Sequence, residues 1–563
     1  MPAPTPLHLA HWPPGLPLNL ALPEQTIVDS LDAAVGRHPD KACMVYYDSV
    51  IRYAQFHADT LNLAAFLQQR CGITRGKRVL LYLQNCPQFA VAFHAVARCG
   101  AIAVPVNPMT RAGELAHYVA DSGADTVILG SEVAAHAAPF FASGALRHGI
   151  WTRYAEALTA PTTLALPEVM QAPVDHTALQ GLRGWSQATA PGLHPTFEPV
   201  SVSPDDLCVM PYTSGTTGHP KGCMHTHRSV LFTAIAGMEW MGMSENDVIL
   251  GAMPYFHVTG MQRCMNGPLH AGATTVVLTR WDAAVAAAVI ERYRVTAWTG
   301  VPTMYIDLLG NPALERYDLS SLTHMSGGGA AMPPAIAERM RERLGGTYIE
   351  GYGLSETIAP SHINPPHRRK RQTLGIPIFN TRSHVIDPRM LAVLPPHEVG
   401  EIVIHGPQVF QGYWGNETAT REAFITLDGL PYFRTGDLGY VDEEGYFHMV
   451  DRLKRMINAS GFKVWPAEVE ALLYNHPAIK EVCVIAASDP HRGETVKALV
   501  VRQPQTSPAL DAQTLMDWAR DQMAAYKVPR LIEFVDSLPK SATGKVEWRA
   551  LQEREKTLVP SAP

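Results

Sequence analysis

Several features that would mark other classes of protein are absent from this sequence. Its eight cysteines are scattered and form no C-x-x-C pair, which argues against a disulfide framework or a cysteine metal site. No uninterrupted apolar run reaches the ~18 residues of a transmembrane helix, so we expect no membrane span. The amino terminus reads MPAPTP and lacks a basic stretch followed by an apolar run, so we expect no secretory signal and a cytoplasmic location.

The chain also has little excess charge of either sign. There are 46 lysines and arginines against 52 acidic residues, so no strongly basic region is indicated and nucleic acid is not an expected partner. Hydrophobic residues make up 46% and charged residues 17%, which excludes disorder or a coiled coil as the main state. At ~100–200 residues per domain, 563 residues predict one large, two-lobed domain and at least one further unit.

Strands and helices are predicted to alternate through the first part of the chain. This alternation is typical of βαβ units and a mainly parallel sheet, so the predicted fold class is α/β. Residues 158–204 are rich in Pro, Thr and Ala and are predicted to be a loop. The predicted strands are 77–83, 101–105, 126–129, 275–279 and 295–298, and the predicted helices are 86–99, 114–122 and 283–294.

The pattern changes near Asp451-Arg452, where we place a domain boundary. The predicted large N-terminal domain, with several lobes, spans residues 1–450, and a small mobile α+β domain spans 451–563. In the small domain we expect a loop-rich tail after two helices and two strands. These are helices near 467–475 and 511–525 and strands at 481–487 and 495–501.

The strongest motif is the segment 212–222, which reads YTSGTTGHPKG. Glycines allow backbone N–H groups to approach an anion, hydroxyls add donors and Lys221 adds a positive charge, so the segment predicts a phosphate-binding loop. It is not a Walker A loop, because Gly222 stands where that motif needs Ser or Thr. The alternative is a surface loop without a binding role, but such a loop would not need all eleven of these residues.

This segment resembles the phosphate loop of the adenylate-forming superfamily, which contains acyl-CoA synthetases, luciferases and peptide-synthetase adenylation domains. The resemblance recurs in order along nearly the whole chain. It rests on GYGLSET at 351–357, YFRTGD at 432–437, DRLKRMI at 451–457 and PKSATGK at 539–545.

The resemblance implies which residues bind the nucleotide. Tyr352 would lie against the adenine, and Asp437, an acceptor-only side chain, would accept hydrogen bonds from the ribose hydroxyls. The full set expected at ATP or AMP is Thr213, Ser214, Gly215, Thr216, Thr217, Gly218, Lys221, Gly328, Gly329, Ala330, Glu350, Gly351, Tyr352, Gly353, Ser355, Asp437, Arg452, Lys454 and Lys545.

The resemblance also implies a Mg²⁺ site at Glu356, with Thr213 as a second ligand. A carboxylate suits Mg²⁺, which takes few protein oxygens together with phosphate oxygens and water. A glutamate in such a turn, seen without the other motifs, would be an ordinary solvated residue.

Two further segments are expected to border the acyl group. The segment 254–260, PYFHVTG, resembles the family's aromatic-histidine motif and places His257 at the acyl carboxylate, either in catalysis or in orienting the carboxylate and gating CoA. The segment 326–331, SGGGAA, either borders the adenine and acyl pockets or forms a Gly-rich turn. The expected acyl pocket contains Val258, Met261, Val301 and Gly327.

Lys545 is the predicted catalytic lysine, since it could neutralise charge as the carboxylate meets the α-phosphate. Lys540 could compete for this role, but the pattern SATGK favours Lys545. The resemblance implies that the small domain rotates about Asp451 and so presents Lys545 for adenylation or a CoA-side loop for thioester formation. That loop contains Ser460, Gly461, Phe462 and Lys463.

The predicted function is an ATP-dependent carboxylate–CoA ligase that uses ATP, CoA and Mg²⁺ and acts on small molecules, and a homodimer is a further expectation. Apolar residues with glycines around the pocket favour a medium- to long-chain fatty acid over acetate. Some long-chain synthetases carry a gate tryptophan at the position of Met261, which this chain lacks. The alternatives are an aryl-acid CoA ligase, an enzyme that loads a free carrier protein, a luciferase-like oxidase and a non-catalytic nucleotide-binding scaffold.

Overall fold

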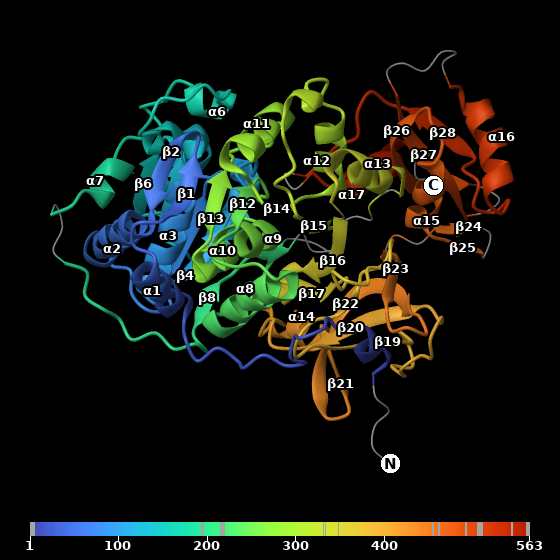
Figure 1. Cartoon of the computed structure of the whole chain (residues 1–563), viewed down its shortest axis with the longest axis horizontal. Helices are drawn as coiled ribbons and strands as arrows, with labels where there is room; N and C mark the ends of the chain where they lie inside the picture. Colours follow the sequence, from blue (N-terminus) through green and yellow to red (C-terminus); the bar gives the residue numbers. More distant parts are fainter. Residues whose placement is uncertain are drawn as a thin grey trace.

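A computed structural model describes most of the chain (Figure 1). It leaves out the side chains of Ala335, Arg452, Asn458, Ala459, Phe462, Lys463, Gly493 and Leu558. The described residues are 6–192, 196–213, 220–329, 332, 334–346, 348–452, 455, 457–459, 462–489, 493–503, 510–541 and 544–558.

The first sheet has seven strands, all parallel except for the antiparallel pair β11–β8. It confirms the strands predicted at 77–83, 101–105 and 126–129. In spatial order the strands are β11 (His225–Thr226), β8 (Leu207–Val209), β4 (Ile102–Pro105), β3 (Arg78–Tyr82), β5 (Thr126–Gly130), β6 (His148–Thr152) and β7 (Arg183–Gly184).

The second sheet has nine strands and is parallel in its centre and antiparallel at both edges. Strand β1, near the amino terminus, pairs in parallel with β13, which lies far along the chain. In spatial order the strands are β18 (Ile376–Pro377), β17 (Ala359–Ile363), β16 (Tyr348–Leu354), β15 (His324–Gly328), β14 (Ala297–Thr299), β12 (Val248–Gly251), β13 (Thr274–Val277), β1 (Ala42–Tyr46) and β2 (Ser49–Arg52).

Helix α3 (Pro87–Arg98) is buried along its whole length, because both large sheets contribute to the core around it. Its few polar side chains form internal contacts, and Arg98 donates to Thr60 Oγ1 and to the carboxylate of Asp32. The first two sheets therefore form one continuous scaffold.

A third sheet, antiparallel throughout, was not predicted from the sequence. Its strands carry no helices between them except the short α14, so the alternation of strands and helices fails in this region. Its long central strand carries Asp437. The strands are β19 (Arg382–Ile386), β20 (Gly400–His405), β22 (Leu430–Val441), β21 (Phe424–Leu427) and β23 (Phe447–Arg452).

The C-terminal unit forms its own five-stranded sheet with a separate hydrophobic core. The two helices and two strands predicted here are confirmed, but the loop-rich tail is wrong, since helix α17 (Trp548–Leu558) packs on β26. The boundary at Asp451 stays a prediction. The strands are β25 (Phe462–Val464), β24 (Ile457–Ala459), β27 (Gly493–Arg502), β26 (Ile479–Asp489) and β28 (Leu531–Phe534).

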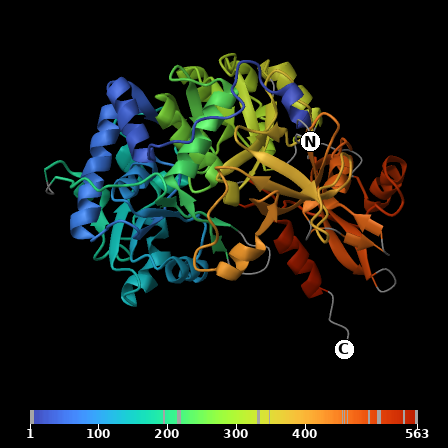
Figure 2. The ribbon, with the colours of Figure 1, turned by 90° about the horizontal axis from the view of Figure 1, so that it is seen from below.

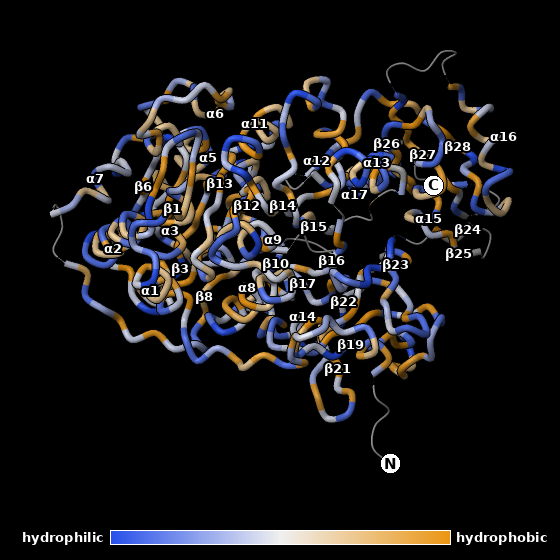
Figure 3. Tube along the Cα trace, in the orientation of Figure 1, coloured by the Kyte–Doolittle hydropathy of each residue, from blue (hydrophilic) through white to orange (hydrophobic). Residues whose placement is uncertain are grey.

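An N-terminal arm of residues 6–25 runs from α1 across to the third sheet (Figures 1 and 2). Trp12 packs edge-on against Trp240, and the Leu20 N–H donates to Asn380 Oδ1 at 2.8 Å. Hydrophobic stretches run through both the large sheets and the C-terminal unit (Figure 3). Among the described helices, none has both the length and the hydropathy of a membrane span.

Most of the helices cover these sheets, and the predicted helices 114–122 and 283–294 are confirmed as α4 and α11. The region 158–204, predicted as loop, contains two short helices and β7. The helices not yet given are α1 (Ile27–Arg37), α2 (Tyr53–Arg70), α4 (Ala112–Ser122), α5 (Ala134–Ala142), α6 (Glu168–Gln171), α7 (Trp185–Thr189), α8 (His227–Met241), α9 (Val258–Gly260), α10 (Gly267–Ala271), α11 (Ala283–Tyr293), α12 (Pro302–Leu309), α13 (Pro334–Leu344), α14 (Glu417–Glu422), α15 (Pro466–Leu473) and α16 (Ala512–Gln522).

Candidate active site

Two short strands that follow β8 flank the predicted phosphate loop. Strands β9 (Tyr212–Thr213) and β10 (Lys221–Gly222) pair so that Thr213 lies opposite Lys221. Gly222 has no room for a side chain, since a Cβ there would lie 2.8 Å from Met210 Sδ. The hairpin therefore holds both ends of the loop close together. The predicted phosphate-binding residues Ser214, Gly215, Thr216, Thr217 and Gly218 lie outside the described residues.

Glu356, the expected Mg²⁺ ligand, lies in a short 3-10 turn, η6 (Ser355–Thr357), that contacts β9. Its side chain is buried, and the hydroxyl of Tyr413 donates to Oε1 at 2.9 Å. The Lys221 ammonium lies 4.6 Å from the centroid of the same tyrosine ring. Tyr413 thus joins the phosphate hairpin to the carboxylate, a role that no sequence motif indicated.

Asp437 and Tyr352, the residues expected at the ribose and the adenine, are brought together by the structure. The Tyr352 hydroxyl donates to Asp437 Oδ2 at 2.6 Å, and Asp437 is buried on β22. Asp437 also lies opposite Arg452 in the pairing of β22 with β23. The second and third sheets therefore meet at this pair.

Gly327 and Gly328 end strand β15 and Gly329 directly follows it, and a side chain at each would meet different neighbours. A Cβ at Gly327 would collide with the Gly300 carbonyl oxygen, and one at Gly328 with the Gly351 carbonyl oxygen, so close strand packing explains both. Gly329 has φ +82°, and a Cβ there would lie 2.8 Å from Lys545 Nζ. At Gly329 the space that a side chain would fill is instead occupied by the Lys545 side chain. Ala330 lies outside the described residues.

Glu350, in β16 just before Gly351 and Gly353, holds two backbone segments in place. Its carboxylate accepts from the Met332 N–H at 3.3 Å and from the Gln372 N–H at 2.9 Å. Burial raises the pKa of Glu350 to about 7. The segment that follows Gly329 is thus tied to β16 through this side chain.

In the C-terminal unit, the Lys545 side chain lies against Gly329, which directly follows strand β15. The neighbouring Gly544 has φ +76° and lies beside Val301 and Thr303, at the start of α12. Lys540, the rival lysine, instead donates to Glu481 Oε1 at 2.8 Å within the C-terminal unit. Lys545, which the pattern SATGK favoured, therefore lies at Gly329, whereas Lys540 pairs with Glu481.

His257 precedes the short helix α9, and its Nδ1 accepts the Thr259 N–H at 3.3 Å. Burial, aided by the positive charge of Lys545, lowers the pKa of His257 to about 3. The ring is therefore neutral near pH 7, and a proton on Nε2 follows from the bond accepted at Nδ1. Such a ring can donate one hydrogen bond to a carboxylate oxygen, which favours orientation over acid catalysis.

Of the four residues expected in the acyl pocket, Val258, Met261 and Val301 are buried in the hydrophobic core that the two large sheets share, and Gly327 lies in β15. Val258 opens α9, Met261 opens a π-helical segment (Met261–Asn266) and Val301 precedes α12. Single π-helical turns within helices often occur at functional sites. Val258 directly follows His257 in the chain, and Val301 lies beside Gly544 of the C-terminal unit.

Asp451, the expected hinge, is buried at the end of β23, and its Oδ2 accepts the Ala467 N–H at 3.0 Å. It thereby caps the first turn of α15, a contact that sequence reasoning missed. Of the nearby expected residues, Phe462 and Lys463 lie in β25 without described side chains, and Lys454, Ser460 and Gly461 lie outside the described residues.

Family models match both parts of the chain. The AMP-binding enzyme model matches residues 31–414, and the AMP-binding enzyme C-terminal domain model matches residues 468–545. The chain belongs to the AMP-binding enzyme family. It is an AMP-forming acid–CoA ligase, a member of the adenylate-forming superfamily that the motifs indicated.

Curated relatives and solved structures agree over nearly the full length of this ligase. It is 34% identical to a long-chain-fatty-acid–CoA ligase of Bacillus subtilis over 97% of this chain and 98% of the relative. It is also 34% identical to a feruloyl-CoA synthase of Amycolatopsis sp, over 90% and 94%. The structure of the anthranilate CoA ligase AuaEII with anthranoyl-AMP superposes with a TM-score of 0.83, at 26% identity over 96% and 98% of the two chains.

Proposed function

We propose that this ligase activates a medium- to long-chain fatty acid as acyl-AMP and then transfers the acyl group to CoA. The observation that carries the choice of acid is that Val258, Met261 and Val301, the side chains expected at the acyl group, are all apolar and buried. Apolar walls stabilise an alkyl chain by about 0.8 kcal/mol per buried CH₂ group and offer nothing to acetate. The similarity to the Bacillus subtilis ligase supports the same class.

An aryl acid is the second candidate, because the chain is also 34% identical to a feruloyl-CoA synthase. Trp298 and Tyr305 lie close to the expected pocket and are fully buried, with ring centroids 3.9 Å apart. Their rings could line a pocket for a flat ring. The panel of acids given below distinguishes these two classes of substrate.

In the proposed adenylation step, a carboxylate oxygen of the acid attacks the α-phosphorus of ATP and pyrophosphate leaves. His257 donates from Nε2 to the other carboxylate oxygen and so fixes its direction. Lys545 would lie between the acid carboxylate and the α-phosphate of ATP, and its positive charge would offset the negative charge that builds up as these two anions approach. Both side chains act without becoming acylated.

The nucleotide is held, in this proposal, by the hairpin and by the third sheet. Lys221 would meet the phosphates, and Asp437, supported by Tyr352, would accept from the ribose hydroxyls. Glu356 and Thr213 offer only oxygen ligands and lie on contacting elements, which fits Mg²⁺. That ion would neutralise the phosphate charge.

In the described orientation Lys545 lies against Gly329, which supports its proposed role in adenylation. Thioester formation would then need the C-terminal unit to turn about Asp451 and bring the loop around Phe462 and Lys463 to the acyl-adenylate. The turn would strain or break the bond between Asp451 and the Ala467 N–H.

A panel of acids tests this proposal through acid-dependent release of pyrophosphate, with and without CoA. Fatty acids of medium to long chain should give the highest kcat/KM, followed by coumarate-like and benzoate-like acids. A preference for aryl acids would move the ligase to the second candidate. Pyrophosphate release without any thioester in the presence of CoA would indicate a carrier protein as acceptor.

A further inference from the structure

A cavity of about 590 Å³ opens at the edge of the first sheet opposite to the phosphate hairpin. Strands β8 and β6 belong to the same parallel set, so the carboxyl end of β8, where the hairpin begins, and the amino end of β6 lie at opposite edges. The cavity lies at the amino end of β6. It is therefore separate from the active site.

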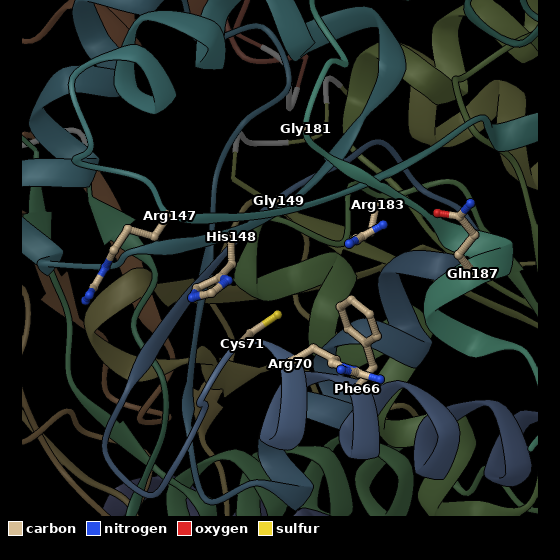
Figure 4. A pocket seen from close by; sticks show the side chains of 9 residues that line it. All are labelled: Phe66, Arg70, Cys71, Arg147, His148, Gly149, Gly181, Arg183 and Gln187. Carbon is tan, nitrogen blue, oxygen red and sulfur yellow. The ribbon is translucent and has the colours of Figure 1, made fainter. Parts of the chain in front are cut away.

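Basic side chains from three elements surround this cavity (Figure 4). His148 opens β6 and Arg147 directly precedes it, Arg183 comes from the edge strand β7, and Arg70 comes from the end of α2. In Figure 4 the β6 pair lies on one side, Arg183 on the other, and Arg70 lies below with Cys71. None of the described residues that line the cavity is acidic.

The positive charge of the cavity is only partly compensated. Arg147 forms an ion pair with Asp125 at 2.5 Å. Within the described ranges, Arg70 and Arg183 form no hydrogen bond or ion pair through their side chains. Arg70 lies in the last turn of α2, where the helix dipole favours a cation, but Arg183 lies on a two-residue edge strand that offers no such reason.

We propose that this cavity binds a small polyanion that carries phosphate groups. The planar guanidinium matches the geometry of phosphate oxygens, and a concave surface lined by charge of one sign strengthens the local potential. The volume lies within the range of small-molecule sites, about 300–1,000 Å³. Arg70 and Arg183 bind the anion, and His148 adds a donor from the opposite side of the cavity (Figure 4).

Cys71 provides a reporter that is specific to this cavity. It lines the cavity and is 7% exposed, whereas each of the other seven cysteines is at most 1% exposed. Burial raises the pKa of its thiol to about 12, so alkylation by iodoacetamide is slow and is best followed at alkaline pH by mass spectrometry. A ligand over Cys71 slows this reaction without any contribution from the active site.

The probe is inorganic tripolyphosphate. At about ten times its dissociation constant, it should slow alkylation of Cys71 about tenfold, whereas KCl of equal ionic strength should not. The double variant Arg70→Gln/Arg183→Gln should lose the protection and keep wild-type acid-dependent pyrophosphate release. The control Arg389→Gln/Arg421→Gln removes the same charge from exposed positions elsewhere and should keep the protection.

Three results would overturn the proposal: no protection beyond that of KCl, protection that persists in Arg70→Gln/Arg183→Gln, or equal protection by citrate, which would remove the phosphate assignment. If the double variant does not fold, as judged by its melting temperature, Arg183→Gln alone is used. Because Arg183 lies at an exposed edge, this single change should leave the fold intact and still weaken the protection.

Discussion

Replacing Lys545 by alanine should stop adenylation and spare the second half-reaction. The lysine lies against Gly329 in the described orientation, close enough to His257 for its charge to lower that ring's pKa. Removing one group that stabilises developing charge in a transition state costs about 2.7–4 kcal/mol, or ~10²–10³ in rate. Acid-dependent release of pyrophosphate should fall by this factor. Thioester formation from supplied acyl-adenylate should stay near the wild-type rate.

Lys540→Ala is the matched control for this prediction. It removes a lysine from the same segment, but one that forms a partly exposed ion pair with Glu481. Such pairs contribute about 0–1 kcal/mol, so both half-reactions should be nearly unchanged. In addition, NMR titration should show a higher pKa for His257 in Lys545→Ala, still below that of free histidine because burial is the larger cause. Equal loss of both half-reactions, or an equal effect of Lys540→Ala, would refute the assignment.

Three further predictions test other parts of the site. Asp437→Ala should weaken ATP binding by about 1.5–3 kcal/mol, the scale of hydrogen bonds to a charged group, and unchanged affinity by calorimetry would contradict the ribose role. Asp451→Pro should keep pyrophosphate release and lower thioester formation by orders of magnitude, because proline fixes φ at the proposed hinge. Wild-type thioester rates in a folded variant would show that the hinge lies elsewhere. The raised pKa of Glu350 means that its neutral form contributes stability below pH 4.5, which is lost as the pH rises through about 7. Between pH 4.5 and about 7, the melting temperature of Glu350→Gln should therefore fall less than that of the wild type. Melting temperatures that change in parallel with pH would contradict this prediction.

Much of the fold could be predicted because buried parallel strands and amphipathic helices leave a strong local pattern. The antiparallel third sheet could not, since it lacks the alternation with helices on which the prediction depended. Helix α17 was missed because it is short of apolar residues and follows a segment rich in turns.

The candidate site was predictable where a motif is continuous in sequence. Lys545 and Gly329 lie far apart in the chain, and no local pattern indicates that one leaves space for the other. The same holds for Tyr413, which bridges Lys221 and Glu356 only because three segments meet. Contacts of this kind depend on tertiary packing and need a structure.

The pairing of β1 with β13 also has a consequence for synthesis on the ribosome. The apolar hairpin of β1 and β2 is complete about 220 residues before its partner strand is made. At ~5–20 residues per second, it waits roughly 10–45 s with an unpaired edge, and exposed strand edges promote aggregation. Production of this chain in cells should therefore depend on chaperones that cover nascent strands, although in the finished enzyme β13 pairs with the open edge of β1.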